Sequence, residues 1–247
     1  MAGAQAVDNP QAIVRQARQS YYDLRREGLS SFQCAVTPDW ELLLQQQRKQ
    51  DPASADAAIK VLSQLRFSAS LAADGSVKLT HNQLTGQSQQ MMDALSQIYG
   101  GMEQMTTGFF DTWKLFVLSP PFPEVESQYQ LQSLGEKYQL SYKDGTADVV
   151  TTMDKSLAIS NLSVTTSDFD SVVRPSFTST PKGLLFNAYS ATYNSKKPQE
   201  ATELKVAIGY QEIQGLEIIQ ELNLSGSYGG SAFAVRLTFS DCQVTKK

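Results

Sequence analysis

The chain has 247 residues, of which 41% are hydrophobic and 19% are charged, and its net charge is −4 at pH 7. A chain of this size and composition can bury a sizeable core, which excludes wholesale disorder. Its acidic balance without a basic stripe excludes nucleic acid as a partner, and no uncharged apolar run is long enough to span a bilayer.

The N-terminal residues 1–9 are expected to be a disordered tail. Ala4-Gln5-Ala6 matches the small-residue pattern at the end of a signal peptide, although no charged or apolar region precedes it. We therefore expect a periplasmic or otherwise exported protein whose signal peptide has been removed. The alternative is an ordinary tail of small residues. Residues 10–247 are expected to form a single domain.

Helices are predicted first along the chain. Asn9-Pro10 is typical of a helix start, and apolar residues recur at helical spacing until Gly28, where we expect the helix to end. A strand is predicted at 32–36. Pro38-Asp39 then begins a second short helix, and Asp51-Pro52 begins a third.

The apolar period changes to two from residue 67. Alternation over 67–79 around Asp74-Gly75 predicts a hairpin. Residues 88–118 return to a helical pattern, which Gly100-Gly101 is expected to break or kink into two pieces. After Pro123 the chain is strand-like, with a second hairpin at Asp144-Gly145. These elements favour an α+β fold, with helices packed on one face of a strongly curved antiparallel sheet.

Residues suited to catalysis or metal binding are scarce. His81 is the only histidine in the sequence, and a lone histidine on an apolar strand face usually has a structural role. No G-x-S-x-G motif is present, and the glycine-rich segment 225–231 lies between predicted strands, which indicates a hairpin turn. Asp168 and Asp170 lack the rest of a calcium loop. We therefore expect no catalytic residue, no metal ligand and no cofactor.

One apolar stretch, residues 102–123, stands out in a polar chain. Two explanations stay open for it: ordinary core packing, or a helix that covers a hydrophobic cavity. Methionines at 91, 92, 102 and 105 lie in the same predicted helix, and methionine adapts to variable apolar partners. The candidate ligand-lining residues are Met102, Met105, Phe109, Phe110, Trp113, Phe116, Phe122, Phe186 and Tyr189.

Several segments of the chain also resemble a known family. The series "VTTMDKSLAISNLSV", "RPSFTSTPKGLLFNAYSATY", "VAIGYQEIQGLEIIQELNLSG" and "AFAVRLTFSDCQV", with "ARQSYYDLRREGLSSFQCAV" near the start, resembles the LolA-like proteins, periplasmic carriers of lipoproteins and their relatives. The resemblance covers roughly residues 10–245 and rests on turn and strand patterns. It implies an incomplete β-barrel whose apolar concave face receives acyl chains and whose mouth is closed by helices. A helical insertion at 39–65 departs from the family pattern.

The residues and the resemblance together predict a non-catalytic protein that binds or carries a lipid or another hydrophobic ligand in the bacterial cell envelope. An envelope lipoprotein is a candidate partner. The protein is expected to be a monomer and to touch membranes only peripherally. Two alternatives stay open: a protein-docking or lipid-sensing regulatory module, and an atypical enzyme acting on a small hydrophobic substrate.

The two cysteines are Cys34 and Cys242, and an oxidising compartment would allow them to pair. Strand alternation places Cys34 beside Phe32 and Val36 on an apolar face, but it places Cys242 on the polar face of its strand. This slightly favours two free cysteines. A bulge near Asp241 would reverse the preference, so the disulfide stays open.

Overall fold

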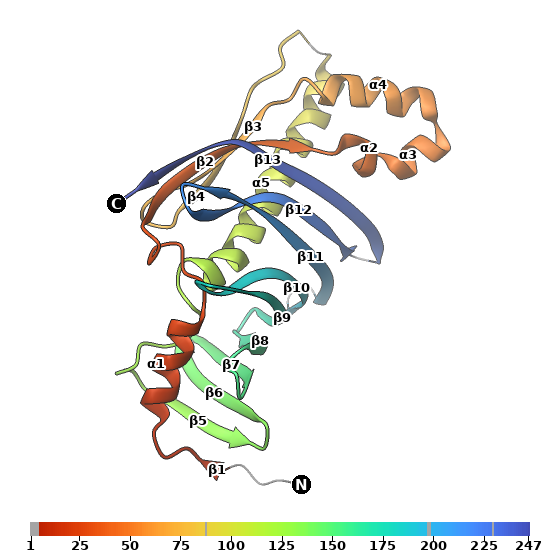
Figure 1. Cartoon of the computed structure of the whole chain (residues 1–247). Coiled ribbons are helices and arrows are strands. Elements are labelled where there is room, and N and C mark those ends of the chain that lie inside the picture. Colours follow the sequence, from red (N-terminus) through yellow and green to blue (C-terminus); the bar gives the residue numbers. More distant parts are fainter. Residues whose placement is uncertain (1–4, 87, 197–198, 229) are drawn as a thin grey trace. The chain divides into compact units, whose positions relative to one another are not determined.

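A computed structural model describes residues 5–86, 88–196, 199–228 and 230–247 and has an α+β fold (Figure 1). The helices are α1 (Pro10–Ser20), α2 (Trp40–Leu43), α3 (Gln45–Gln50), α4 (Pro52–Leu62) and α5 (Gln89–Val117). The strands are β1 (Gln5–Ala6), β2 (Leu29–Pro38), β3 (Phe67–Leu71), β4 (Val77–His81), β5 (Tyr129–Leu134), β6 (Lys137–Asp144), β7 (Ala147–Asp154), β8 (Ile159–Thr165), β9 (Phe169–Thr180), β10 (Gly183–Lys196), β11 (Gln199–Ile213), β12 (Leu216–Tyr228) and β13 (Ser231–Lys246).

The strands form an antiparallel sheet in the order β1-β5-β6-β7-β8-β9-β10-β11-β12-β13-β2-β3-β4. From β5 to β13 each strand pairs with the next along the chain, so the predicted meander is confirmed. Strands β2, β3 and β4 continue the sheet beyond β13. Since the order begins at β1 and ends at β4, the sheet is open. No described helix is both long enough and apolar enough to cross a bilayer.

The chain forms two compact units. Unit 1 holds the described residues of Met1–Asp23, Ser119–Ile208 and Leu224–Phe233, and unit 2 holds those of Leu24–Leu118, Gly209–Asn223 and Ala234–Lys247. Compact units can belong to one domain, so the predicted single domain over 10–247 stays a prediction. Within the predicted tail, residues 1–4 lie outside the described ranges, whereas Gln5–Ala6 pair with β5.

Unit 1 packs α1 and the loop after α5 onto one face of its strands. Arg18 of α1 donates hydrogen bonds to the carbonyl oxygens of Phe122 and Pro123 at 2.8 and 2.9 Å. The buried Tyr21 hydroxyl donates to the Leu157 carbonyl oxygen at 2.8 Å and accepts from the Ile159 amide at 2.7 Å. These polar contacts fix the helix and loop to the sheet with few unsatisfied groups.

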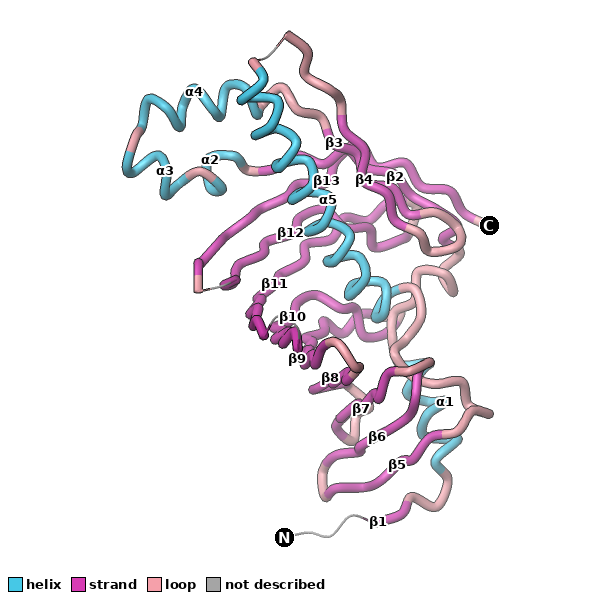
Figure 2. The backbone as a smooth tube through the Cα atoms, turned by 180° about the vertical axis from the view of Figure 1, so that it is seen from behind, coloured by secondary structure: helices cyan, strands magenta, loops and turns pink. Residues whose placement is uncertain are grey.

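Unit 2 contains α2 to α5 and the strands at the β4 end of the sheet. Helix α5 runs along one face of these strands, as Figure 2 shows from behind. Its rings contact Phe32 of β2 and Phe239 of β13. Helices α2, α3 and α4 occupy the segment between β2 and β3, where Arg48 pairs with Asp56 at 3.1 Å.

Local sequence signals are confirmed where they concern caps and turns. The side chains of Asn9, Asp39 and Asp51 cap α1, α2 and α4, each accepting a hydrogen bond from a backbone amide. The hairpins β3–β4 and β6–β7 turn at Gly75 (φ +84°) and Gly145 (φ +58°), a conformation that glycine adopts without strain.

Three helix predictions were wrong. Helix α1 ends at Ser20 rather than near Gly28, because the chain leaves it to join the sheet, where the Tyr22 amide donates to the Leu184 carbonyl at 3.0 Å. The second predicted helix is two helices, α2 and α3, that meet at Leu44. Helix α5 continues unbroken through Gly100 and Gly101. Its buried face stabilises it there, whereas both glycines are exposed.

Candidate functional site

The candidate site is built on one stripe of α5. One row of mostly buried residues along this helix recurs at alternating spacings of four and three, which places the row on one side of the helix. This pattern is typical of a helix that packs lengthwise on another surface. We call this row the α5 stripe; it consists of Leu95, Tyr99, Met102, Thr106, Phe109, Trp113 and Phe116.

Aromatic side chains dominate the C-terminal half of the α5 stripe and its surroundings. The Phe110 ring stands edge-on to Trp113 at 5.6 Å and to Phe239 of β13 at 6.1 Å between ring centroids. Trp113 is fully buried, lies edge-on to Phe32 at 6.2 Å, and donates its indole N–H to the Tyr210 hydroxyl at 2.9 Å. Such edge-on pairs add to the gain from burying apolar area.

The other end of the α5 stripe carries a different arrangement. Tyr99 stacks on His81 of β4, with ring centroids 3.7 Å apart and planes inclined by 10°. Phe67 of β3 lies beside both rings. The His81 Nδ1 atom lies 2.9 Å from the Asn82 carbonyl oxygen, so in the neutral ring Nδ1–H donates to it. His81 therefore has the packing contacts expected of a structural histidine.

Two hydroxyl groups on the α5 stripe are buried without a hydrogen-bond partner among the described residues: Thr106 Oγ1 and the Tyr99 hydroxyl. The Thr106 side chain has no exposed surface. By contrast, Thr112 on the same helix donates to the Gly108 carbonyl oxygen at 3.4 Å. A buried hydroxyl left unpaired costs about 1–3 kcal/mol. Neither group was predicted from the sequence, although a threonine at a core position of an apolar stripe is a readable signal.

The two halves of α5 differ in burial. From Gln89 to Gly101 only Leu95 is fully buried, whereas the remainder holds all the other buried residues of the helix. The C-terminal end is also fixed by the Leu24 amide, which donates to the Val117 carbonyl at 2.7 Å. A Cβ atom added at Gly100 or Gly101 would meet open space. The N-terminal half is therefore the part that can leave the sheet at lower cost.

The structure divides the predicted ligand-lining residues between the two units. Five of them are buried in unit 2: Met102, Phe109, Phe110, Trp113 and Phe116. Met105 on the same helix is half-buried. Phe122, Phe186 and Tyr189 are buried in unit 1 instead, where Phe186 and Tyr189 stack at 5.5 Å. The side chains of the first group are closed in by the chain itself, so a ligand must displace part of α5 to reach them.

Unit 1 has a separate groove of about 790 Å³ on β5, β6 and β7. Cross-strand pairing places the rows Gln130–Ser141–Val150 and Lys143–Asp148 on one face of these strands, and the groove is also lined by Tyr129, Tyr142 and Val149 from the other face. Lys143 and Asp148 form an ion pair at 2.7 Å. The groove can hydrogen-bond a polar ligand, but its residues include no nucleophile with a neighbouring base.

The face of these strands that carries Tyr142 is more buried than the opposite face, although Tyr142 itself is half-buried. Burial, with a smaller contribution from Asp144, raises the pKa of Tyr142 to about 12, so its hydroxyl stays protonated at neutral pH. Burial likewise raises the pKa of Tyr21 well above its usual range. Both tyrosines therefore act as neutral hydrogen-bonding groups rather than as acids or bases.

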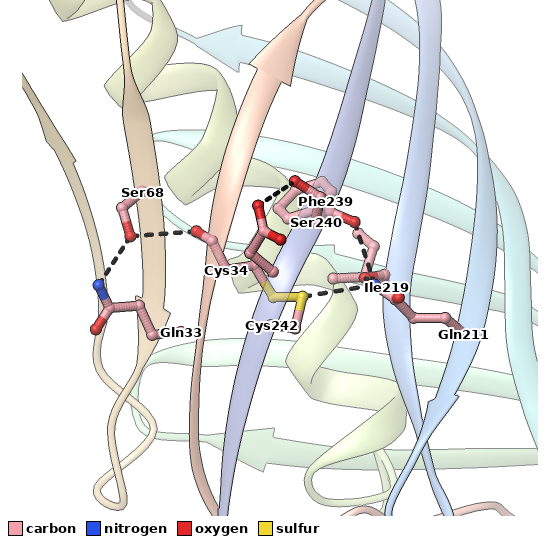
Figure 3. Close-up of a disulfide and its surroundings, with 9 residues drawn as sticks. Gln33, Cys34, Ser68, Gln211, Ile219, Phe239, Ser240 and Cys242 are labelled. Carbon is pink, nitrogen blue, oxygen red and sulfur yellow. Dashed lines mark hydrogen bonds between the residues drawn. A yellow bond between two sulfur atoms is a disulfide. The ribbon is translucent and has the colours of Figure 1, made fainter.

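Cys34 and Cys242 form a disulfide, with Cα atoms 4.1 Å apart (Figure 3). The slight preference for two free cysteines was wrong. The pairing of β13 with β2 shifts register between Ser240 and Gln243, and Asp241 adopts φ +51°. This bulge turns Cys242 toward Cys34 by reversing the strand alternation that would otherwise place it on the polar face.

The surroundings of the disulfide are ordered by strand-to-strand hydrogen bonds. The Gln211 side-chain amide donates to the Phe239 carbonyl at 3.1 Å and to the Ile219 carbonyl at 3.3 Å (Figure 3). Ser68 donates to the Cys34 carbonyl at 3.2 Å. The bond therefore joins the first and last long strands of unit 2 at the bulge in β13.

Comparison with known proteins yields no match: no family model, curated protein or solved structure is similar to this chain. The resemblance to the LolA-like proteins therefore stays a prediction. Within the described ranges, no group of three or more His, Cys, Asp or Glu residues lies together as a metal site would require.

Proposed function

We propose that the chain is a lipid-binding protein of the bacterial cell envelope with a LolA-like half-barrel fold, and that it binds the apolar part of its ligand between α5 and the strands of unit 2. The observation that carries this proposal is the α5 stripe. It lays Phe109, Trp113 and Phe116, with Phe110 beside them, along an open antiparallel sheet. Each buried CH₂ group of a ligand contributes about 0.8 kcal/mol, so an apolar surface of this kind binds an acyl chain without precise polar chemistry.

Ligand entry follows from the unequal burial of α5. The N-terminal half of the helix separates from the sheet first, and the acyl chain enters there and extends along the α5 stripe toward Phe116. Because Gly100 and Gly101 lie at the boundary, the helix there has the lowest intrinsic stability. The Cys34–Cys242 disulfide supports export, since such bonds persist in oxidising compartments.

The first experiment asks whether a lipid is bound. Native mass spectrometry of protein purified from the envelope should show a population heavier than the chain by the mass of a lipid. After delipidation, an apolar dye such as N-phenyl-1-naphthylamine should bind, and its emission should rise. Protein without adduct that also fails to bind the dye would refute the proposal and favour the protein-docking alternative.

The second experiment tests entry at the N-terminal half of α5. The double variant Gly100→Ala/Gly101→Ala stabilises the helix by roughly 2 kcal/mol, at about 1 kcal/mol per glycine, so dye uptake should slow about 30-fold. Gly108→Ala is the matched control, because it lies in the fixed half with the same open space around it. Equal uptake rates for all three proteins would exclude entry by this route.

A further inference from the structure

The unpaired hydroxyl of Thr106 lies in the middle of the α5 stripe, between Met102 and Phe109. Its side chain is fully buried, and no described residue accepts or donates a hydrogen bond to Oγ1. Thr112 on the same helix satisfies its hydroxyl locally, on the carbonyl oxygen four residues back. Thr106 does not use this local solution, so its hydroxyl remains available to a partner that enters the site.

The second unpaired hydroxyl, that of Tyr99, belongs to the same row. Seven residues separate Tyr99 from Thr106, which corresponds to about 10 Å along the helix axis. Beyond Thr106 the stripe continues with Phe109, Trp113 and Phe116, which offer only apolar surface except for the indole N–H already bonded to Tyr210. The stripe therefore has a polar segment toward the N-terminus of α5 and an apolar segment toward its C-terminus.

From this arrangement we infer that the ligand is a single-chain lipid with a neutral hydrogen-bonding head, a hydroxyl or an ester or amide carbonyl, that pairs with Thr106. The inference rests on the proposed function and specifies its ligand. The head lies between Tyr99 and Thr106, and the hydrocarbon chain points toward Phe116. Threonine and tyrosine hydroxyls both donate and accept, so they satisfy either kind of head.

An ionised head group fits this site poorly. The charged residues of α5 nearest to Thr106 are Glu103 and Asp111, and both are exposed. No lysine, arginine or histidine belongs to the α5 stripe, although His81 stacks on Tyr99. A carboxylate buried beside Thr106 would find no cation on the α5 stripe, and burying an unpaired charge is far more costly than burying a neutral polar group.

The first test needs no ligand. Thr106→Val keeps the shape of the side chain and removes the unpaired hydroxyl, so the urea midpoint of the variant should equal or exceed that of the parent. Thr112→Val removes a bonded hydroxyl and should lower the midpoint, and the half-buried Thr107 provides the control Thr107→Val for placing valine in this helix. A loss for Thr106→Val as large as that for Thr112→Val would show that Thr106 is bonded within the protein and overturn the inference.

The second test compares ligands of one chain length by displacement of the bound dye: dodecanol, monododecanoylglycerol, dodecane and dodecanoate at pH 8. The two neutral polar lipids should bind about 10-fold more tightly than the alkane and the carboxylate. Thr106→Val should abolish this preference without weakening the binding of dodecane, and Tyr99→Phe should reduce the preference. If all four ligands bind equally to the parent, the inference fails and the proposed function stands. If none binds, the proposed function fails with it.

Discussion

The Cys34–Cys242 disulfide provides a quantitative prediction. The bond spans 208 residues of sequence. In the chain-entropy model, a closed loop of that size stabilises the fold by about 5 kcal/mol, and removal of native disulfides typically costs 2–5 kcal/mol. We therefore expect reduction to lower the free energy of unfolding of unit 2 by ~2–5 kcal/mol.

Tryptophan fluorescence is the appropriate assay. The sequence contains two tryptophans, and both Trp40 and Trp113 are buried in unit 2, so their emission follows the unfolding of this unit. With a slope of roughly 2 kcal/mol per molar urea, the expected loss moves the midpoint down by about 1–2.5 M. Far-UV circular dichroism on the same samples follows both units.

The control is the double variant Cys34→Ala/Cys242→Ser, in which apolar alanine replaces the buried Cys34 and polar serine replaces the half-buried Cys242. Its midpoint should equal that of the reduced parent and should not respond to added reductant. If the oxidised and reduced parent proteins unfold at the same urea concentration, the bond contributes nothing and the loop-entropy reasoning is refuted.

Three further predictions concern unit 1. Gly183→Ala should destabilise this unit by at least about 2 kcal/mol in thermal unfolding, because φ of Gly183 is +119° and a Cβ atom would lie 2.7 Å from the Ser20 carbonyl oxygen. The control Gly145→Ala should cost about 1 kcal/mol, because a Cβ atom there would meet open space. Tyr21→Phe removes both hydrogen bonds of a buried hydroxyl and should lower the free energy of unfolding by about 2–3 kcal/mol. Tyr129→Phe removes one hydrogen bond of a part-buried hydroxyl and should lower it by less than about 1 kcal/mol; equal losses for the two variants would contradict the burial argument. Because the pKa of Tyr142 is about 12 in the folded chain and about 10 when unfolded, its contribution to stability is fully present below pH 10 and is lost between pH 10 and 12. Tyr142→Phe should therefore make the fall in stability over this range shallower in urea titrations, while the raised pKa of Tyr21 maintains the remainder; an unchanged pH profile would contradict it.

The elements that the sequence predicts correctly are those determined by neighbouring residues. Asn9 and Asp51 start helices because their side chains bond amides three residues ahead. The meander follows from strand alternation and from turns at glycine. Long-range contacts determined what the sequence did not predict: the early end of α1 depends on the pairing of Tyr22 with Leu184, which lies more than 160 residues away.

The positions of the candidate residues were predicted only where they depend on neighbouring residues in one helix. Spacing along α5 is enough to place Phe109, Trp113 and Phe116 on one face, and all three are buried in unit 2. Spacing gives no information about Phe122 and Phe186, which belong to unit 1. Spacing also places Thr106 in the row of apolar residues, but it could not predict that its hydroxyl is unpaired, because a lack of hydrogen-bond partners depends on every group packed around it.

The position of β13 in the sheet also determines when unit 2 can fold during synthesis. Strand β13 is synthesised after the other described strands, yet it is the strand that joins β2, β3 and β4 to the others in the sheet. During synthesis, α5 and these early strands must therefore wait for more than 100 residues before unit 2 can close. Throughout that interval Phe110 lacks Phe239, its ring partner on β13. The nascent chain should be a client for chaperones that hold apolar segments, and truncation before residue 234 should leave it dependent on them.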